Sequence, residues 1–367
     1  MKSYHISILL FVLILSSGCN DQYRQLASEK KAKNVILLIG DGMGLAQAST
    51  AFYFQKEEPN FVRFPVIGLH RNPPSEALIT DSAAGATAFS TGYKSYNAAI
   101  GVDADSISRE TILEIAARKG KSTGLIATSS ITHATPASFY AHVPHRNLEE
   151  DIASQLPSSP VDFFAGGGLQ FFTQREDGAN YLDTLASRGY VVNPQKLERP
   201  GNLSLEHKYG YLLAPEGMPK MQEGRGDFLP QATQLALDYL GQDKDGFFLM
   251  VEGSQIDWGG HDNDAEYVIQ ETLDFDKAIG VALDFAEKDG NTLVIVTADH
   301  ETGGMSLSAA KVRMQSDYRH INPTFSTGGH SASLIPVYAY GPGSGFFMGI
   351  YQNNEIFGKM LRAFRLK

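Results

Sequence analysis

The sequence predicts an α/β fold, an α/β/α sandwich in which helices cover both faces of a central, mostly parallel β-sheet. Five short apolar runs have the length and composition of strands that are buried on both faces. Between them, apolar residues recur every three or four positions, which is typical of helices that pack one face against a sheet. This alternation along a chain favours a parallel sheet with helices on both sides.

The first predicted strand runs straight into a turn. It covers Asn34–Ile39 and is followed by Gly40, Asp41 and Gly42. The other four predicted strands are Thr123–Thr128, Phe247–Val251, Thr292–Thr297 and Pro336–Tyr340. The clearest helical patterns lie at Arg109–Lys119 and Ala265–Lys288.

The middle of the chain is less regular. Between Asp151 and Asp245 it contains the run Gly166–Gly168 and several other Gly and Pro residues, which predicts loops or an elaboration packed on the main sheet. Because no shift in composition divides the chain, we expect one domain over residues 34–367.

The composition of the chain limits the functions that it can have. The chain has 367 residues, 43% apolar and 20% charged, which is enough for a large core. Its 41 acidic against 31 basic residues argue against binding to nucleic acid or to an anionic membrane surface. The single Cys excludes an intrachain disulfide and any zinc site built from several Cys.

The N-terminus has the pattern of a bacterial export signal. The apolar run Ile6–Leu15 is ten residues long, too short for a membrane-spanning helix, which needs about 20. It is followed by small residues and then Cys19, which predicts a signal peptide over residues 1–18, a lipid on Cys19 and a polar tether over 19–33. The alternative is an ordinary secretory signal with an incidental Cys. Either way we expect export, to the periplasm or, as a lipoprotein, to the outer membrane, with the lipid as the only membrane attachment.

Metal-ligating residue types follow three of the predicted strands. In open α/β sheets, ligands bind outside the carboxyl ends of the strands, so these side chains are expected to share one crevice. Carboxylates and imidazoles together suit Zn²⁺ or a related divalent ion. His330, on the Gly-rich loop Thr327–Ser331, adds another imidazole. The residues that follow the strands are Asp41, Glu252, Asp257, His261, Asp299 and His300.

The surroundings of these histidines lead to two further expectations. Asp257 and His261 are four residues apart, but Gly259 and Gly260 lie between them, so we expect a tight turn rather than a helix. Three other histidines lie near no such pattern and are expected at the surface. They are His70, His207 and His320.

The segment Thr80–Gly92 contains a candidate nucleophile. Asp81 or Ser82 opens a run of small, helix-compatible residues, which places the Ser82 hydroxyl at a helix N-terminus, where an anion is stabilised. The alternative is a simple N-cap on a tightly packed helix. Beside a metal cluster, an activated serine nucleophile is favoured.

Six segments together resemble the alkaline phosphatase family, in family order. They are Asn34–Gly44 (NVILLIGDGMG), Thr80–Gly92 (TDSAAGATAFSTG), Thr132–Arg146 (THATPASFYAHVPHR), Phe247–Asp264 (FFLMVEGSQIDWGGHDND), Thr292–Gly304 (TLVIVTADHETGG) and Thr327–Ala332 (TGGHSA). The resemblance implies hydrolysis of phosphate monoesters through a phosphoserine, with two Zn²⁺ and one Mg²⁺-type ion. Because family members commonly form homodimers, a homodimer is expected.

The resemblance also implies a role for each matching residue. Ser82 becomes the nucleophile, Arg146 binds phosphate beside Asp81, and Trp258 lies near the phosphate. One zinc site comprises Asp257, His261 and His330, and the second comprises Asp41, Asp299 and His300. Asp41 also reaches the third site, completed by Thr135 and Glu252. Two divalent ions about 4 Å apart suit an in-line displacement at phosphorus.

Two positions depart from one branch of the family. His133 stands where many bacterial members carry Asp, which leaves the identity of the third metal open. Trp258 stands where they carry Lys, and the loss of that cation is expected to weaken phosphate binding. Other branches carry His at the first position and His or Trp at the second.

The sequence disfavours three other functions. A related sulfatase would need a C/S-x-P-x-R motif, whereas the five residues from Ser82 onward are SAAGA. A phosphodiesterase is disfavoured by Arg146, which suits a terminal phosphate. A lipid-anchored binding protein with a structural metal site is disfavoured because structural zinc sites are usually rich in Cys.

Overall fold

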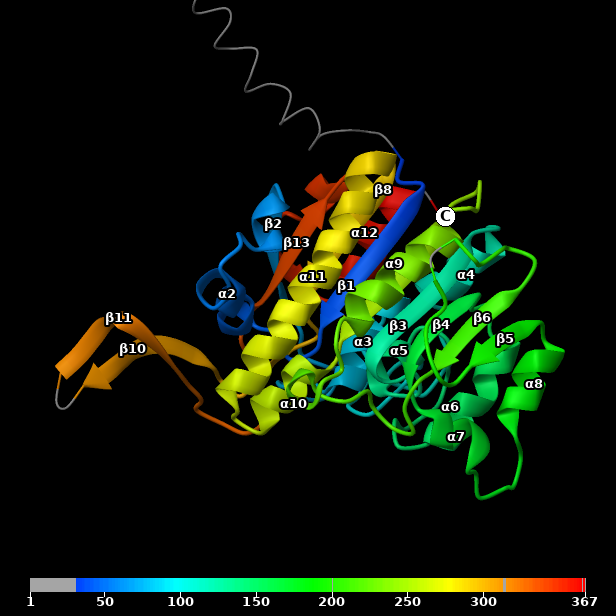
Figure 1. Ribbon diagram of the computed structural model, residues 1–367, viewed down its shortest axis with the longest axis horizontal. Helices are drawn as coiled ribbons and strands as arrows, with labels where there is room; N and C mark the ends of the chain where they lie inside the picture. Colours follow the sequence, from blue (N-terminus) through cyan, green and yellow to red (C-terminus); the bar gives the residue numbers. More distant parts are fainter. Residues whose placement is uncertain (1–30, 200, 313–314, 365, 367) are drawn as a thin grey trace, which may run out of the picture.

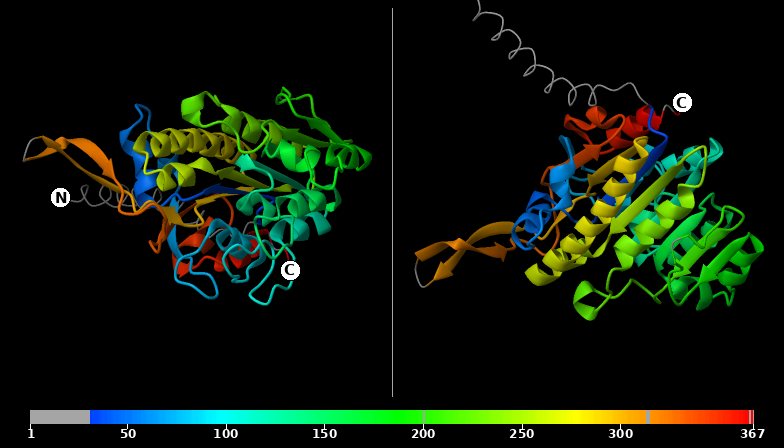
Figure 2. Two further views of the ribbon diagram at one scale, coloured as in Figure 1. Left: turned by 90° about the horizontal axis from the view of Figure 1, so that it is seen from below. Right: turned by 45° about the horizontal axis from the view of Figure 1, so that its top comes forward.

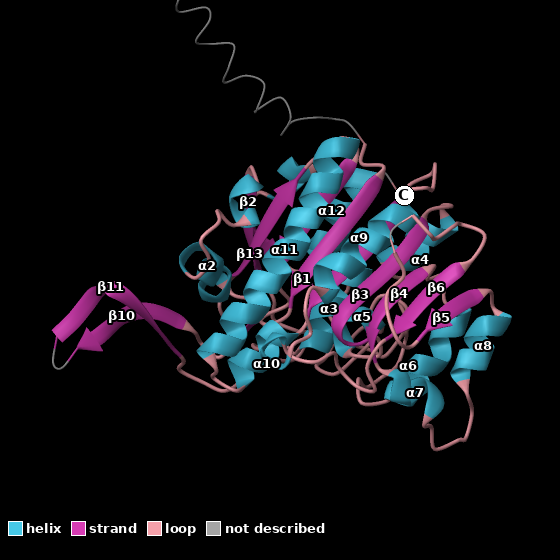
Figure 3. Cartoon of the chain, viewed as in Figure 1, coloured by secondary structure: helices cyan, strands magenta, loops and turns pink. Residues whose placement is uncertain are grey.

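The computed structural model describes residues 31–199, 201–312, 315–364 and 366. Across these residues, ten strands form one sheet in the order β14-β2-β13-β8-β1-β7-β3-β4-β6-β5 (Figures 1 and 3). Among the described strands of this sheet, β13 alone runs antiparallel to its neighbours. The predicted α/β sandwich with a mostly parallel sheet is confirmed. The predicted signal peptide, Cys19 and most of the predicted tether lie outside the described residues.

The sheet strands are β1 (Asn34–Gly40), β2 (Val66–Arg71), β3 (Ser122–Ser130), β4 (Phe163–Gly167), β5 (Tyr190–Asn193), β6 (Lys208–Leu212), β7 (Phe247–Gly253), β8 (Thr292–Thr297), β13 (Ile335–Tyr340) and β14 (Gly349–Gln352). Two small two-stranded sheets comprise β10 (Ser306–Val312) with β11 (Gln315–Thr324) and β9 (Glu301–Thr302) with β12 (His330–Ser331). The α-helices are α2 (Leu45–Tyr53), α3 (Ser82–Thr91), α4 (Ile112–Arg118), α5 (Ala134–Ala137), α6 (Glu149–Gln155), α7 (Leu169–Thr173), α8 (Tyr181–Ser187), α9 (Phe228–Leu240), α10 (Gln255–His261), α11 (Ala265–Asp289) and α12 (Glu355–Phe364). Four 3-10 helices, η1 (Asn60–Arg63), η2 (Leu156–Ser158), η3 (Met221–Glu223) and η4 (Ser344–Phe347), complete the described helices.

The continuous apolar runs reflect burial on both faces of the sheet. Alternate residues of β1 point to opposite sides: Val35 and Leu37 pack with α3, α4 and α12, whereas Ile36 and Leu38 pack with α2, α9 and α11. β7 and β8 alternate in the same way. Since helices cover both faces, the residues on either side of these strands are apolar, and the alternation of apolar and polar residues that is typical of a half-exposed strand is absent from them. In Figure 1, helix α11 lies beside β1 and runs roughly in the direction of the strands.

The middle of the chain extends the main sheet rather than forming loops alone. Here β4, β6 and β5 continue the parallel sheet beyond β3. The glycines of β4 are a sign of close approach, because a Cβ on Gly167 would lie 1.8 Å from the Glu216 carbonyl oxygen. The expected elaboration is therefore present, but as sheet strands.

A hairpin formed by β10 and β11 projects from the body of the molecule (Figures 1 and 2). Tyr318 on this hairpin is 88% exposed. Within the described residues, no helix has the combined length and apolar character needed to cross a bilayer.

A buried ion cluster ties the loop before α9 to α11. The Arg225 guanidinium is fully buried and contacts the carboxylates of Glu271 and, at 2.9 Å, Asp274. We expect Arg225→Ala to lower the free energy of unfolding by about 3–5 kcal/mol, because two buried carboxylates lose their counter-charge. Lys277→Ala, which removes a half-exposed partner of Asp227, should cost less than about 1 kcal/mol. Urea unfolding of both variants checks this, and a loss for Arg225→Ala as small as the control's would contradict it.

Candidate active site

The carboxyl ends of β1, β7 and β8 meet at one edge of the sheet. In the parallel register, Ile39 on β1 lies opposite Glu252 on β7 and Thr297 on β8. The chain leaves each strand within a few residues of these positions, which carries Asp41 and Asp299 into the same crevice. The predicted clustering of strand-end residues is thus observed.

Three groups of possible metal ligands form in this crevice. In each group the ligand atoms lie within 4.8 Å of one another. The first comprises Asp257, His261 and His330, the second Asp41, Asp299 and His300, and the third Asp41, His133 and Glu252. Asp41 belongs to both the second and the third group.

Buried negative charge dominates the second and third groups. Asp41, Glu252 and Asp299 are all fully buried. Burial raises the pKa of Asp299 to about 8, helped by the nearby carboxylates, and that of Glu252 to about 7. Burial and the same carboxylates also raise the pKa of Asp41 well above its ordinary value. Such a cluster is stable as carboxylates only with cations among them.

Unpaired oxygens point to the same conclusion. Both carboxylate oxygens of Asp41, Oε1 of Glu252 and Oγ1 of Thr135 accept or donate no hydrogen bond within the described part of the chain, although all are buried. Buried polar atoms are normally paired. Oxygen-rich sets of this kind suit hard cations, and the imidazoles of the first two groups suit zinc, so the donors present fit the metals that the sequence predicts.

Asp257 and His261 lie on helix α10, so the expected tight turn is wrong. Both ligands project from one face, with Nε2 of His261 3.3 Å from Oδ2 of Asp257. Burial alone would raise the pKa of Asp257, but the hydrogen bond from His261 and three nearby imidazoles lower it. Gly260 allows close packing, because a Cβ there would lie 2.9 Å from the carbonyl oxygen of Thr302. The helix forms because its tertiary contacts outweigh the poor helix propensity of glycine.

The imidazoles of the first group are held by backbone carbonyls. Nδ1 of His261 lies 2.8 Å from the Gly328 carbonyl oxygen, and Nδ1 of His330 lies 2.8 Å from that of Thr80. When each Nδ1 donates its proton, Nε2 is left free to face the site, 3.2 Å from the other Nε2.

Ser82 begins helix α3, and Asp81 is its N-cap. Oδ1 of Asp81 accepts a hydrogen bond from the Ala84 N–H at 3.0 Å. The Ser82 hydroxyl lies 3.3 Å from Nε2 of His300, in the second group. Every residue of α3 is buried, and a Cβ added to Gly85 would lie 3.0 Å from Cβ of Asp299, so small residues let the helix approach the carboxylates. The helix N-terminus and the second group therefore face the same hydroxyl.

Arg146 lies between Asp81 and His133. Its Nη1 is 3.2 Å from Oδ2 of Asp81 and its Nη2 is 3.1 Å from Nε2 of His133. Burial, with a further contribution from Arg146, lowers the pKa of His133 to about 3, so this imidazole is neutral and can accept from Arg146 or bind a cation. Trp258 stands edge-on to His133, with ring centroids 6.2 Å apart. The third group, the arginine and the tryptophan thus adjoin one another.

Two features of this part of the molecule were not predicted from the sequence. Thr302 donates a hydrogen bond to Oδ1 of Asp257 and lies 3.2 Å from Nδ1 of His300, so it links the first two groups. Its position two residues after His300 was the only signal. His70, expected at the surface, is buried on β2 with Nε2 3.0 Å from the Ala298 carbonyl oxygen, and burial lowers its pKa to about 4. His207 and His320 are exposed.

Comparison with known proteins places these features in a family. A family model described as alkaline phosphatase matches residues 32–323. Alkaline phosphatase 3 of Bacillus subtilis (strain 168) is 34% identical over 424 aligned positions, which cover 93% of this chain and 91% of that protein. The solved alkaline phosphatase of the Antarctic bacterium TAB5 is 57% identical, with a TM-score of 0.90 over 92% of this chain and 99% of that one. A histidine-to-aspartate variant of that enzyme, with Mg bound in its M3 site, is 56% identical, with a TM-score of 0.91 and the same 92% and 99% coverage. The matched family model spans the strands β1, β7 and β8 that build the crevice, and the chain belongs to the alkaline phosphatase family of phosphomonoesterases.

Proposed function

We propose that Ser82 is the nucleophile of this phosphatase. Its Oγ loses its proton and attacks the phosphorus of a phosphate monoester, the bond from phosphorus to the alcohol oxygen breaks, and the alcohol leaves with a proton as phosphoserine forms. Attack by water on the same phosphorus then releases inorganic phosphate and restores the hydroxyl. The observation that carries this proposal is the place of Ser82 at the start of α3, 3.3 Å from Nε2 of His300. We assign the whole reaction to a single catalytic domain over residues 34–367.

The same proposal assigns the metals, two Zn²⁺ and one Mg²⁺. Asp257, His261 and His330 would hold one zinc, and Asp41, Asp299 and His300 the other. Asp41, Thr135 and Glu252 would hold the third, Mg²⁺-type ion with His133 alongside. The TAB5 structure with Mg bound in its M3 site is a variant in which a histidine is replaced by aspartate, so it does not by itself support Mg²⁺ beside His133. When bound, these cations supply Lewis-acid stabilisation of negative charge on oxygen.

The chain's own residues bind and orient the phosphoryl group. Arg146 offers a planar pair of N–H donors that suits two phosphate oxygens, and Asp81 holds one end of this fork. The free N–H groups at the start of α3 point toward the same anion. Trp258 supplies an aromatic side chain in place of a cation, so that, apart from the metals, Arg146 and the start of α3 hold the phosphate.

Arg146→Ala tests the proposed phosphate contact. We expect KM for a phosphate monoester to rise about tenfold or more, and inhibition by inorganic phosphate to weaken in parallel, because two charge-assisted hydrogen bonds are lost. Steady-state kinetics with added phosphate measures both. Arg188→Ala, an exposed arginine on the C-cap of α8, is the matched control. Phosphate inhibition equal to that of the wild type would contradict the assignment.

The substrate class is tested with three esters. The protein from Asn20 onward, with Zn²⁺ and Mg²⁺ present, is assayed on a phosphate monoester, a phosphate diester and a sulfate ester between about pH 7 and pH 10. We expect strong monoesterase activity that rises toward alkaline pH. Preference for the diester or the sulfate ester would overturn the substrate class.

We also propose that the chain is exported and anchored by a lipid on Cys19. The chain's unique Cys, placed directly after small residues that follow an apolar run, supports this. Expression with a labelled fatty acid, followed by fractionation, should place the label and the activity in the outer-membrane fraction. Cys19→Ser should lose the label, and retention of the label in that variant would contradict the proposal.

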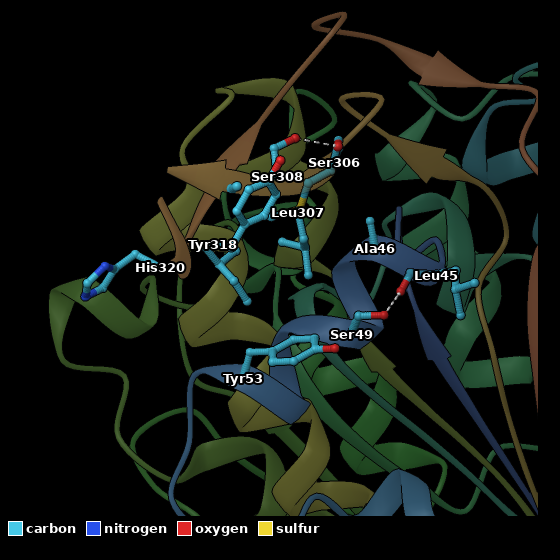
Figure 4. A pocket seen from close by; sticks show the side chains of 12 residues that line it. Leu45, Ala46, Ser49, Tyr53, Ser306, Leu307, Ser308, Tyr318 and His320 are labelled. Carbon is cyan, nitrogen blue, oxygen red and sulfur yellow. Dashed lines mark hydrogen bonds between the residues drawn. The ribbon is translucent and has the colours of Figure 1, made fainter. Parts of the chain in front are cut away.

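We infer that a second copy of the chain covers the groove between α2 and the β10–β11 hairpin (Figure 4). This groove of about 730 Å³ is lined by Leu45 and Tyr53 of α2 and by Leu307 and Tyr318 of the hairpin. Leu45 is 59% exposed and Tyr53 64% exposed, an apolar surface that association would bury. Sedimentation should report a homodimer, and the double variant Tyr53→Ser, Tyr318→Ser should report a monomer. A monomeric wild type would overturn this inference.

A further inference from the structure

A short turn at Asn97–Ala98 lies beside the segment that leads to the nucleophile. The two stretches run side by side: the Ser75 N–H donates to the Ser95 carbonyl at 2.8 Å, and Lys94 Nζ donates to the Pro73 carbonyl at 2.6 Å. The backbone N–H of Asn97 donates to Oε1 of Glu76 at 2.9 Å. The turn is therefore docked along the loop that precedes Ser82.

The Asn97 side chain holds the backbone on both sides of Thr80. Its Oδ1 accepts from the Asp81 N–H at 2.9 Å, and its Nδ2 donates to the Ile79 carbonyl at 3.1 Å. The amide oxygen and the amide nitrogen of Asn97 thus each bind one of the two peptide units that flank Thr80. The Thr80 carbonyl belongs to the same planar peptide unit as the Asp81 N–H, and it contacts Nδ1 of His330 at 2.8 Å. The amide consequently fixes the direction of the carbonyl that orients this imidazole.

Ala98 connects the same turn to Asp81 and to Arg146. Its N–H donates to Oδ2 of Asp81 at 2.9 Å, and its carbonyl accepts from the Arg146 N–H at 2.8 Å. Ala98 has a φ of +74°, a left-handed conformation that is unfavourable for a residue with a Cβ. Ala98 makes both backbone hydrogen bonds in this unfavourable conformation, so the surrounding structure must hold it there.

We infer that Asn97 is a positioning residue for phosphoryl transfer. It sets the backbone of Thr80–Asp81, and through it the start of α3, the His330 imidazole and the Asp81 carboxylate that orients Arg146. Asn97 itself touches neither Ser82 nor the ligand groups, so it acts through these neighbours. Small displacements of a nucleophile lower rates strongly, since reacting atoms must be aligned within a fraction of an ångström. The inference rests on the proposed role of Ser82.

The test is the rate at which Ser82 becomes phosphorylated in the metal-loaded enzyme. With a phosphate monoester in a single-turnover quench, we expect Asn97→Ala to lower this rate about 10- to 100-fold. Gln242→Ala is the matched control, because the Gln242 amide also binds two backbone carbonyls, each at 3.0 Å, at the opposite end of the sheet. The control should stay within about twofold of the wild type.

The readouts separate positioning from a general loss of stability. Folded fraction and metal content of Asn97→Ala should match those of the wild type at the assay temperature, while kcat falls and inhibition by phosphate weakens through Arg146. If Asn97→Ala does not fold, Asn97→Asp, which keeps the acceptor for the Asp81 N–H and loses the donor to Ile79, is measured in its place. A phosphorylation rate within about twofold of the wild type would overturn the inference alone. A wild type that forms no phosphoserine at Ser82 would overturn the proposed function, and this inference with it.

Discussion

Ser82→Ala should abolish formation of the phosphoenzyme and lower kcat for a phosphate monoester at least about 1,000-fold. The hydroxyl is the atom that attacks phosphorus, and alanine offers no group in its place. Because Ser82 is buried at the first turn of a helix whose cap is Asp81, the smaller side chain should leave the fold and the ligand groups intact. Rapid-quench labelling with a ³²P monoester, followed by acid precipitation, measures the phosphoenzyme directly.

Ser90→Ala is the matched control for that experiment. Ser90 lies on the same buried helix but donates its hydroxyl to the Thr87 carbonyl, two turns from the site. Its variant should keep the phosphoenzyme and most of kcat. If Ser82→Ala retained near-normal turnover while circular dichroism showed a folded protein, another group would have to be the nucleophile.

Removal of the metals should have the second large effect, on both activity and stability. After chelation we expect phosphatase activity to vanish, and to return only when Zn²⁺ and Mg²⁺ are restored. The buried carboxylates Asp41, Glu252 and Asp299 lose their counter-charge, so the metal-free protein should also melt at a lower temperature. A cation present at 100 times its Kd stabilises a protein by about 2.7 kcal/mol for each site.

The stability of the metal-free protein should fall as pH rises above about 6.5. Burial raises the pKa of Asp299 to about 8 and that of Glu252 to about 7, so these two carboxyls bind more protons in the folded than in the unfolded chain between about pH 4 and pH 8. The stability that they contribute is therefore lost as pH passes through the raised values. The lowered pKa values of the buried His133 and His70 act in the opposite direction, but only below about pH 6.5, where the unfolded imidazoles take up protons. With metals bound the protons are displaced, and this dependence should largely disappear.

Thermal melts at about pH 6.5 and pH 9, with and without metals, measure both effects. A metal-free protein that is more stable at about pH 9 than at about pH 6.5 would contradict the assigned pKa directions of the carboxyls. Equal melting temperatures with and without metals would contradict the metal assignment itself.

The sequence predicted the parallel strands and most of the candidate site for one physical reason. Strands buried on both faces are continuous apolar runs, and in a parallel sheet their carboxyl ends share an edge. The sequence alone therefore predicted that Asp41, Glu252 and Asp299 lie close together. The strands of the middle segment were not predicted because β4 carries glycines where the Glu216 backbone approaches, and glycines in a sequence indicate a loop.

Other failures came from contacts distant in sequence. The glycines before His261 predicted a turn, but packing of α10 against Thr302 and α11 favours a helix. The positioning bonds of Asn97 and Thr302 join segments with no periodicity or spacing that connects them. Hydrogen bonds between such segments depend on the finished fold, and a single sequence carries no local signal of them.

The complete burial of α3 limits how this enzyme can be altered by directed evolution. Because every position from Ser82 to Thr91 is enclosed, a mutational scan should find this stretch nearly as intolerant as the metal ligands, for reasons of volume alone. Loss of function there would not distinguish chemistry from packing. Libraries aimed at new substrates should therefore leave α3 unchanged and diversify exposed positions close to site residues along the chain. Leu78, four residues before Ser82, and Leu334, four residues after His330, offer side chains that can change without disturbing the core.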